Sequence, residues 1–255
     1  MHNFNINVQR QLAPSSVLQI GYVGSLGTKL AFTLNINAPL PGTTGTTQSR
    51  RPFNGRFPTF GSISLLETSA TSSYNSLQVS LVQNNWHGLS GSFSYTLGHS
   101  IDTSSEARNT LPANSYDVRN ERGNSAFDVR HTFRGSFTWD IPVFLRSLPD
   151  RLVKGWQVNS ILAFNTGTPI NITAGYNRSL SGDGNDRVDL VGDPAAGRSG
   201  TRYLNPAAFS VPRNATGGAV TDGKFCSLGR NALYGPVFRA VDVSRFKTTE
   251  ITEKL

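Results

Sequence analysis

The sequence lacks several features that would place it in a common class of protein. It has one cysteine, Cys226, and four scattered histidines, so it can form no internal disulfide and shows no zinc-site spacing. Its apolar runs are far shorter than the roughly 18 residues that a membrane-spanning helix needs, which excludes a helical membrane protein. Residues 1–11 contain neither the basic nor the apolar segment of a signal peptide. The sequence alone therefore predicts either a cytoplasmic protein or a part of a longer chain.

Charged side chains are also sparse. Asp, Glu, Lys and Arg make up 16% of the 255 residues, and the formal net charge is +8. The basic residues are dispersed, mostly as arginines in loops rich in Gly, Asn and Pro, whereas phosphate recognition rewards clustered Lys and Arg. We therefore expect no nucleic-acid partner.

The clearest pattern that is present is a strict alternation over residues 127–142. Apolar side chains and one glycine occupy the odd positions, broken only by His131, and polar or charged side chains occupy the even ones. One apolar face opposite one wet face is typical of a strand. Alternation over about 9 to 11 residues that ends in an aromatic residue also fits a tilted strand crossing a bilayer.

In a bilayer, the two faces of this strand would have different surroundings. The residues expected to face lipid are Phe133, Phe137 and Trp139. The residues expected to face a wet lumen are Thr132, Arg134, Ser136 and Thr138, with Gln157 and Asn159 on the following strand. Trp139 and Trp156 lie near strand ends, where tryptophan is typical of the membrane interface.

Strand patterns recur along the chain, and helix signals are nearly absent. The other predicted strands cover residues 3–11, 17–24, 29–34, 75–81, 89–97, 155–165, 170–174 and 237–248. We expect 17–34 to be one long bent strand. In 237–248 the alternation slips at Ala240 and Val241, which predicts a bulge.

Tight turns alternate with long polar loops at residues 35–58, 101–126 and 166–236. Short turns on one side and long loops on the other are typical of outer-membrane barrels. The sequence therefore predicts an all-β fold, a segment of an antiparallel transmembrane β-barrel with long extracellular loops. The alternative is a secreted or cell-surface β-sandwich that binds glycans or proteins.

A series of short motifs, taken in order, resembles the barrel of the Oar-like TonB-dependent transporters. The most specific are FDVRH at 127–131 and GWQ at 155–157, accompanied by YNSLQ at 74–78, ERG at 121–123, GTP at 167–169 and GRN at 229–231. The resemblance spans nearly the whole chain. It implies a barrel in the outer membrane of a Gram-negative bacterium, closed by an N-terminal plug and energised through TonB. The implied partners are outer-membrane lipid, the remainder of the barrel and its plug, and TonB only through the N-terminal part.

The chain departs from this family pattern at both ends. It contains no plug, no TonB box and no closing strand that ends in an aromatic residue, and it has fewer than half of the ~22 strands of large transporters. We therefore expect residues 1–255 to be a partial barrel that lacks its plug, signal peptide and closing strands.

Two groups of residues could carry chemistry. The ERG motif and the triplet Asp128, Arg130 and His131 could suggest acid–base catalysis, but no nucleophile or paired-carboxylate motif supports it. We expect these residues to order a long loop against the rim of the barrel. A weak calcium candidate, made of Asp183, Asn185 and Asp189, lacks the final glutamate of an EF-hand and fits a solvated turn equally well. We expect no catalysis and no cofactor.

Overall fold

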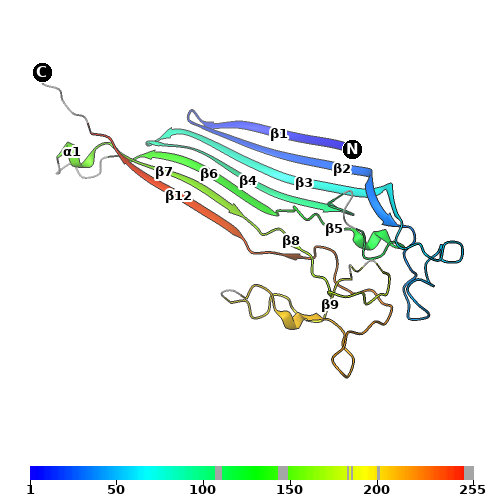
Figure 1. The fold of residues 1–255 in the computed structure, drawn as a ribbon. Helices are drawn as coiled ribbons and strands as arrows, with labels where there is room; N and C mark the ends of the chain where they lie inside the picture. The colour runs from blue at the N-terminus through cyan, green and yellow to red at the C-terminus, as the bar shows by residue number, and fades with distance from the viewer. Residues whose placement is uncertain (107–110, 143–148, 183, 185, 200–201, 250–255) are drawn as a thin grey trace, which may run out of the picture.

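The protein, seen in a computed structural model, is built around one large antiparallel sheet. The structure describes residues 1–106, 111–142, 149–182, 184, 186–199 and 202–249. The strands follow the order β1-β2-β3-β4-β6-β7-β12, so neighbours in the chain are neighbours in the sheet (Figure 1). Their bounds are β1 His2–Ala13, β2 Ser16–Asn35, β3 Ser64–Trp86, β4 Leu89–Asp102, β6 His131–Asp140, β7 Trp156–Asn165 and β12 Phe238–Lys247.

The remaining elements are short and lie in the connections. The strand β5 (Gly123–Asn124) extends the sheet beside β4, while two small ribbons pair β8 with β11 and β9 with β10. Their bounds are β8 Pro169–Ile170, β9 Asp189–Leu190, β10 Phe209–Ser210 and β11 Leu233–Tyr234; the helical turns are η1 Val118–Glu121, α1 Asp150–Val153 and η2 Pro206–Ala208. In the part of the chain that is described, no helix is long and apolar enough to cross a membrane.

The connections differ in length at the two ends of the sheet. Tight turns join β1 to β2 and β3 to β4 at the turn end, where the link between β6 and β7 also lies (Figure 1). In the β3–β4 turn, Gly88 has a φ of +84° and approaches the Asp140 carbonyl so closely that a Cβ would lie 2.4 Å from it, which favours glycine. The loops at 36–63, 103–130 and 166–237 all emerge at the opposite, loop end. The predicted asymmetry is confirmed.

Cross-strand register sorts the side chains of the sheet into two faces, because residues directly opposite each other point the same way. One continuous row runs from Val79 through Tyr95 and Phe133 to Phe164. We call the face that carries this row the apolar face. It also holds Phe4, Ile6, Val8, Leu18, Ile20, Tyr22, Leu77, Leu81, Phe93, Phe137, Trp139, Leu162, Val241 and Val243.

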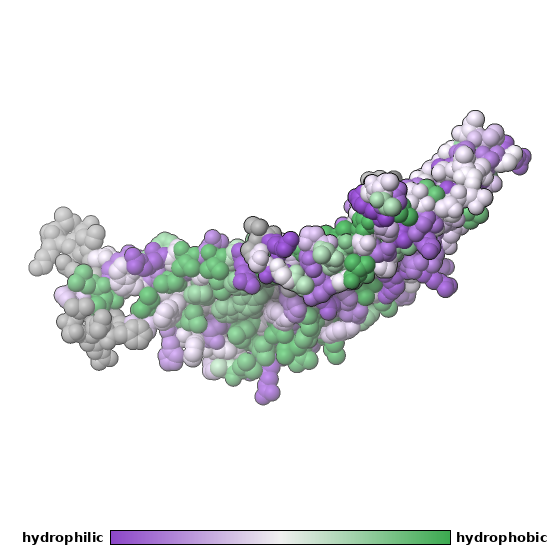
Figure 2. Space-filling view, turned by 90° about the horizontal axis from the view of Figure 1, so that it is seen from below, coloured by the Kyte–Doolittle hydropathy of each residue, from purple (hydrophilic) through white to green (hydrophobic). Residues whose placement is uncertain are grey.

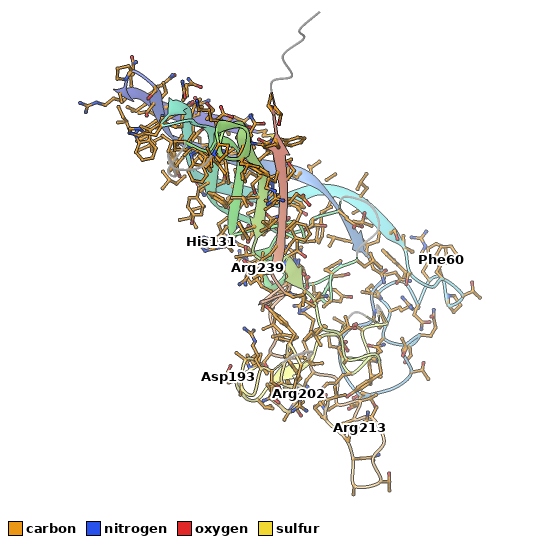
Figure 3. All side chains as sticks on the ribbon, turned by 90° about the vertical axis from the view of Figure 1, so that its left-hand side faces the viewer. Phe60, His131, Asp193, Arg202, Arg213 and Arg239 are labelled. Atoms are coloured by element: carbon orange, nitrogen blue, oxygen red, sulfur yellow. The ribbon has the colours of Figure 1, made fainter. Side chains whose placement is uncertain are left out.

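The opposite, polar face is lined mainly by Asn, Gln, Ser and Thr. Its members include Asn3, Asn5, Asn7, Gln9, Gln19, Ser76, Gln78, Ser80, Ser90, Ser92, Ser94, Thr96, Thr132, Arg134, Ser136, Thr138, Gln157 and Asn159. In Figure 2 the hydrophobic surface lies over the strands, whereas the loop end is largely hydrophilic. Figure 3 shows Asp193, Arg202 and Arg213 in this loop region, beyond the strands.

The strands pack chiefly against their hydrogen-bonded neighbours, and within the described residues no second sheet covers either face. Both faces are therefore available to their surroundings. This is the arrangement of a barrel wall that has not closed, and it differs from the two-layer core of a sandwich. Most of the fully buried side chains are polar: Asn37, Ser125, Ser179 and Asp186 lie in the loops, Asn35 ends β2 and Ser76 lies in β3.

The structure confirms one uncertain strand prediction. Residues 17–34 fall within the single strand β2, which pairs with β3 over its length and bulges near Lys29, where φ is +55°. The bend keeps both halves of β2 in one ladder.

Three other strand predictions were wrong. The strand expected over 127–142 begins only at His131. The strand expected at 170–174 shrinks to β8. No bulge interrupts β12, which pairs with β7 residue by residue and therefore places Phe238 and Phe246 on the polar face. In this last case the register of the neighbouring strand outweighs the hydrophobic pattern of the sequence.

Candidate functional site

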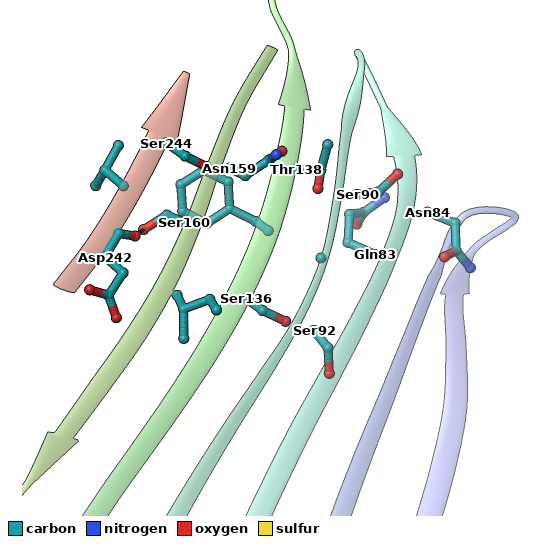
Figure 4. A pocket seen from close by; sticks show the side chains of 14 residues that line it. Gln83, Asn84, Ser90, Ser92, Ser136, Thr138, Asn159, Ser160, Asp242 and Ser244 are labelled. Atoms are coloured by element: carbon teal, nitrogen blue, oxygen red, sulfur yellow. Dashed lines mark hydrogen bonds between the residues drawn. The ribbon is translucent and has the colours of Figure 1, made fainter. Parts of the chain in front are cut away.

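A shallow hollow of about 660 Å³ lies in the polar face toward the turn end (Figure 4). Two cross-strand rows of side chains form its walls: Ser90, Thr138, Asn159 and Ser244 in one row, and Ser92, Ser136, Ile161 and Asp242 in the other. The backbone of the row between them, which contains Gly91, Phe137, Ser160 and Val243, forms its floor. The lining residues are Gln83, Asn84, Ser90, Gly91, Ser92, Ser136, Phe137, Thr138, Asn159, Ser160, Ile161, Asp242, Val243 and Ser244.

The chemistry of the hollow is that of neutral hydrogen-bonding groups. Hydroxyls and amides dominate the lining, and Asp242 is its one ionisable side chain among the described residues. The Oδ1 atom of Asn159 is buried and has no hydrogen-bond partner in the described structure. A buried acceptor of this kind needs a water or a solute donor. The hollow therefore fits water and polar solutes and offers no nucleophile–base arrangement.

The residues predicted to face the lumen all lie on the polar face, and three of them, Ser136, Thr138 and Asn159, line the hollow. Arg134 donates to the Asn165 Oδ1 atom at 2.6 Å, and Gln157 donates to Asp140 at 2.8 Å. Thr132 lies nearer the loop end of the same face. The residues predicted to face lipid, Phe133, Phe137 and Trp139, lie on the apolar face.

Sequence reasoning missed the other walls of the hollow. Ser90 and Ser92 could have been found, because they alternate with apolar residues in β4 in the same way as Ser136 does in β6. Ser244 and Asp242 could also have been found, because they alternate with Val241 and Val243, and the slipped pattern of 237–248 misplaced Phe238 and Phe246 instead.

Buried arginines join the second and third long loops into one cap over the loop end of the sheet. Arg187 donates to both carboxylate oxygens of Glu121 at 3.1 and 3.2 Å, and these two side chains are only 9% and 6% exposed. Arg230 bonds the Asp102 carboxylate at the end of β4 and the Glu121 carbonyl at 2.6 Å. The ERG motif thus ties the second loop to the third.

Asp128 of the FDVRH motif fastens the start of β6 to the same cap. Its carboxylate accepts from the Ser100 N–H at 2.6 Å and from the Tyr234 hydroxyl at 2.7 Å, and it lies 3.2 Å from the His99 Nδ1 atom. Burial, with the hydrogen bond to Asp128, raises the pKa of Tyr234 well above its usual value, so this hydroxyl stays a donor. The chain turns at Ala126 and Phe127, and these contacts hold Asp128 outside the strand, which explains why β6 starts late.

A third charged cluster surrounds Arg178 in the last loop. Its guanidinium forms two bonds of 2.9 Å with Asp222, which lower the pKa of that carboxyl, and it also bonds Asp189. Burial raises the pKa of the nearby Cys226 thiol, which is therefore neutral at pH 7.

The calcium candidate falls partly in this cluster. Asp183 and Asn185 lie outside the described residues. The Asp189 carboxylate is engaged by Arg178 and by the Ser227 N–H at 2.8 Å. Among the described residues no group of three or more His, Cys, Asp and Glu side chains could hold a metal. The calcium site stays a prediction.

The substitution Glu121→Ala should loosen the cap. It leaves the Arg187 guanidinium buried without its counter-charge, and removing one partner of a buried pair costs about 3–5 kcal/mol. We expect faster proteolysis within the 103–130 and 166–237 loops of the folded, membrane-inserted protein. The control is the double variant Glu121→Ala, Arg187→Met, which removes the stranded charge and should recover much of the resistance. Equal sensitivity of the single and double variants would contradict the role of the pair.

The comparisons with known proteins agree with this geometry. The chain has no significant match among curated proteins or among solved structures. The model of one family, described as an outer membrane beta barrel domain, matches residues 1–255. The antiparallel sheet, its two unlike faces and its unequal ends are features of such a domain. The chain therefore belongs to the outer membrane beta barrel domain family and resides in the outer membrane of a Gram-negative bacterium.

Proposed function

We propose that this chain forms part of the wall of a TonB-dependent, Oar-like transport barrel, with its polar face lining the route of a solute. The observation that carries this proposal is the polar face itself. Neutral amides and hydroxyls cover it across β1 to β7, and they surround a hollow in which the Asn159 acceptor has no protein partner. Such a surface suits a wet lumen or a polar solute.

The apolar face must then contact lipid. The strands β6, β7 and β12 have 10 residues each, which suits the 9 to 11 that a tilted transmembrane strand needs. The reverse orientation would place Arg134 in hydrocarbon, at a cost of about 2–4 kcal/mol near the midplane. It would also expose the aromatic side chains of β6 to water.

The TonB-dependent type is supported by the ordered motifs, above all FDVRH and GWQ. It implies that the rest of the barrel, a plug and TonB, acting through the plug, are partners. We propose no catalytic activity and no cofactor for the chain, since its charged clusters serve to hold loops together. A surface adhesion function is the alternative, and it would not require a solute path.

Ion conductance of the full-length protein in planar bilayers tests the proposal. A plugged transport barrel should conduct little, and it should open when a moderate urea concentration unfolds the plug. A steady open conductance without urea would contradict the plug. The absence of conductance under every condition would favour adhesion.

The topology can be tested with single cysteines in a Cys226→Ser background. Thr216 lies at an exposed tip of the last loop, and His87 lies in the exposed β3–β4 turn at the other end. We expect Thr216→Cys to react with a membrane-impermeant maleimide on whole cells, and His87→Cys to react only after the outer membrane is permeabilised. The reverse labelling would invert the topology.

A further inference from the structure

All three tryptophans of the protein lie at the turn end of the apolar face. Trp86 and Trp139 belong to one cross-strand row, which also contains Arg245, while Trp156 lies beside Lys247 in the next paired position. Tryptophan prefers the headgroup level of a membrane. This row therefore marks the level of the lipid headgroups on the side of the turns.

Two cations are held on one of these rings. The Arg245 Cζ atom and the Lys247 Nζ atom each lie 4.9 Å from the centroid of the Trp156 ring. The indole N–H donates to the Leu152 carbonyl at 2.8 Å, and Lys247 also donates to the Lys154 carbonyl, so both the ring and the ammonium are anchored. Three parts of the chain therefore form this arrangement: the end of the β6–β7 link, the first residue of β7 and the last residues of β12.

Among the residues that the structure describes, no carboxylate balances the positive charge at this place. Neither Arg245 nor Lys247 forms an ion pair within the described residues, and the carboxylates of the neighbouring strand segments, Asp140 and Asp242, lie on the polar face. Two like charges two positions apart on a strand repel each other, and an anion between them would relieve this repulsion. At this level of the membrane, the available anion is a lipid phosphate.

We propose that Arg245 and Lys247, held over the Trp156 ring, bind the headgroup phosphate of an anionic phospholipid in the periplasmic leaflet. The inference rests on the proposed function only through the outward orientation of the apolar face. A strand that pairs with the free edge of β12 would lie beside these side chains and leave their face open. The site therefore remains accessible in a completed barrel.

Lipid retention in native mass spectrometry tests the site. The full-length protein is released from nanodiscs that contain equal amounts of phosphatidylglycerol and phosphatidylcholine. We expect the wild type to retain phosphatidylglycerol preferentially. In the double variant Arg245→Gln, Lys247→Gln, the ratio of retained phosphatidylglycerol to phosphatidylcholine should fall roughly tenfold. The conservative variant Arg245→Lys keeps the charge and should keep the preference.

The matched control is Arg239→Gln, which removes a charge from the same face of β12 at its loop end (Figure 3). It should leave the preference for phosphatidylglycerol unchanged. Equal retention by the wild type and the double variant, or an equal loss in Arg239→Gln, would overturn the site.

A bimane probe on Leu162→Cys separates failure of the site from failure of the orientation. Position 162 lies on the apolar face beside Val241, two rows deeper in the membrane than the row of Trp139 and Arg245. Quenching by lipids that are brominated in the acyl chain shows that this face meets lipid, whatever the cations bind. Quenching without a phosphatidylglycerol preference refutes the site alone, whereas absence of quenching refutes the orientation.

Discussion

Phe137→Arg should abolish most assembly of the folded barrel, whereas Ser136→Arg should be tolerated. The two residues are adjacent in β6 and point to opposite faces. An arginine on the lipid face of a barrel costs about 2–4 kcal/mol near the midplane. On the lumen face, the same side chain remains hydrated.

Packing adds to the difference between the two positions. The Phe137 ring stacks on Phe93, with a centroid distance of 6.4 Å, and Phe137 lies directly opposite Gly91, which has no side chain. Ser136 lies in the wall of the hollow, where its cross-strand neighbours are Ser92 and Ile161. An arginine at position 136 therefore has room, whereas one at position 137 removes an aromatic contact as well as entering hydrocarbon.

The heat-modifiable folded fraction of the full-length protein on a gel provides the measurement. We expect a small folded fraction for Phe137→Arg and a fraction close to the wild type for Ser136→Arg. If both variants folded equally well, the orientation of the apolar face would be wrong.

The faces of the strands could be predicted from the sequence because the period of two is a local property. Thr132 to Trp139 were assigned to the correct faces of the sheet with no knowledge of their neighbours. The long loops were also predictable, since their Pro, Gly and Asn content excludes a strand. These signals do not depend on partners that are distant in the chain.

The strand ends could not be predicted, because contacts between distant segments determine them. The first part of β3, residues 64–73, has no clear alternation, yet it pairs with the far half of β2. Conversely, FDVRH continues the alternation of β6, but Asp128 bonds Tyr234, which is 106 residues away, and the chain turns there. In both places the partner decides the structure.

The faces of the residues that line the hollow follow from alternation, including Asp242 and Ser244, which alternate with Val241 and Val243. The faces of Phe238 and Phe246 could not be predicted, because the register that β7 imposes removes the bulge that the sequence favoured. The pairing of β12 with β7 also gave no local signal. The cap of buried arginines left a weaker signal, since the motifs contain the charged residues but do not reveal which pairs form.

Residues 1–255 produced without further strands should not form a stable monomeric barrel. The two edge strands, β1 and β12, each pair on one side only. Both run from the loop end to the turn end, since Ala13 and Lys247 lie at the turn end. Direct pairing of β1 with β12 would therefore create a parallel seam in a sheet that is otherwise antiparallel.

A ring of identical copies meets the same obstacle. If every copy keeps its loops outside, each junction places β12 of one copy beside β1 of the next, and the two strands are again parallel. A two-fold arrangement that makes these pairs antiparallel would put the loops of one copy on the periplasmic side. An antiparallel closure therefore requires an odd number of additional strands, the first and last of which run from the turn end to the loop end.

In lipid, an open edge has a free-energy cost that the chain cannot avoid, since no water reaches its unpaired N–H and C=O groups. We therefore expect the isolated chain to aggregate on refolding into detergent or liposomes, and to be rescued when the complementary strands are supplied as a second polypeptide. Gel filtration and heat modifiability provide the measurement. A monodisperse, protease-resistant monomer would show that β1 and β12 close on each other, and the parity argument would be wrong. A second comparison tests the same argument independently, because each added strand reverses the direction of the free edge. If a polypeptide with an even number of strands rescued the chain as well as one with an odd number, the parity argument would be refuted.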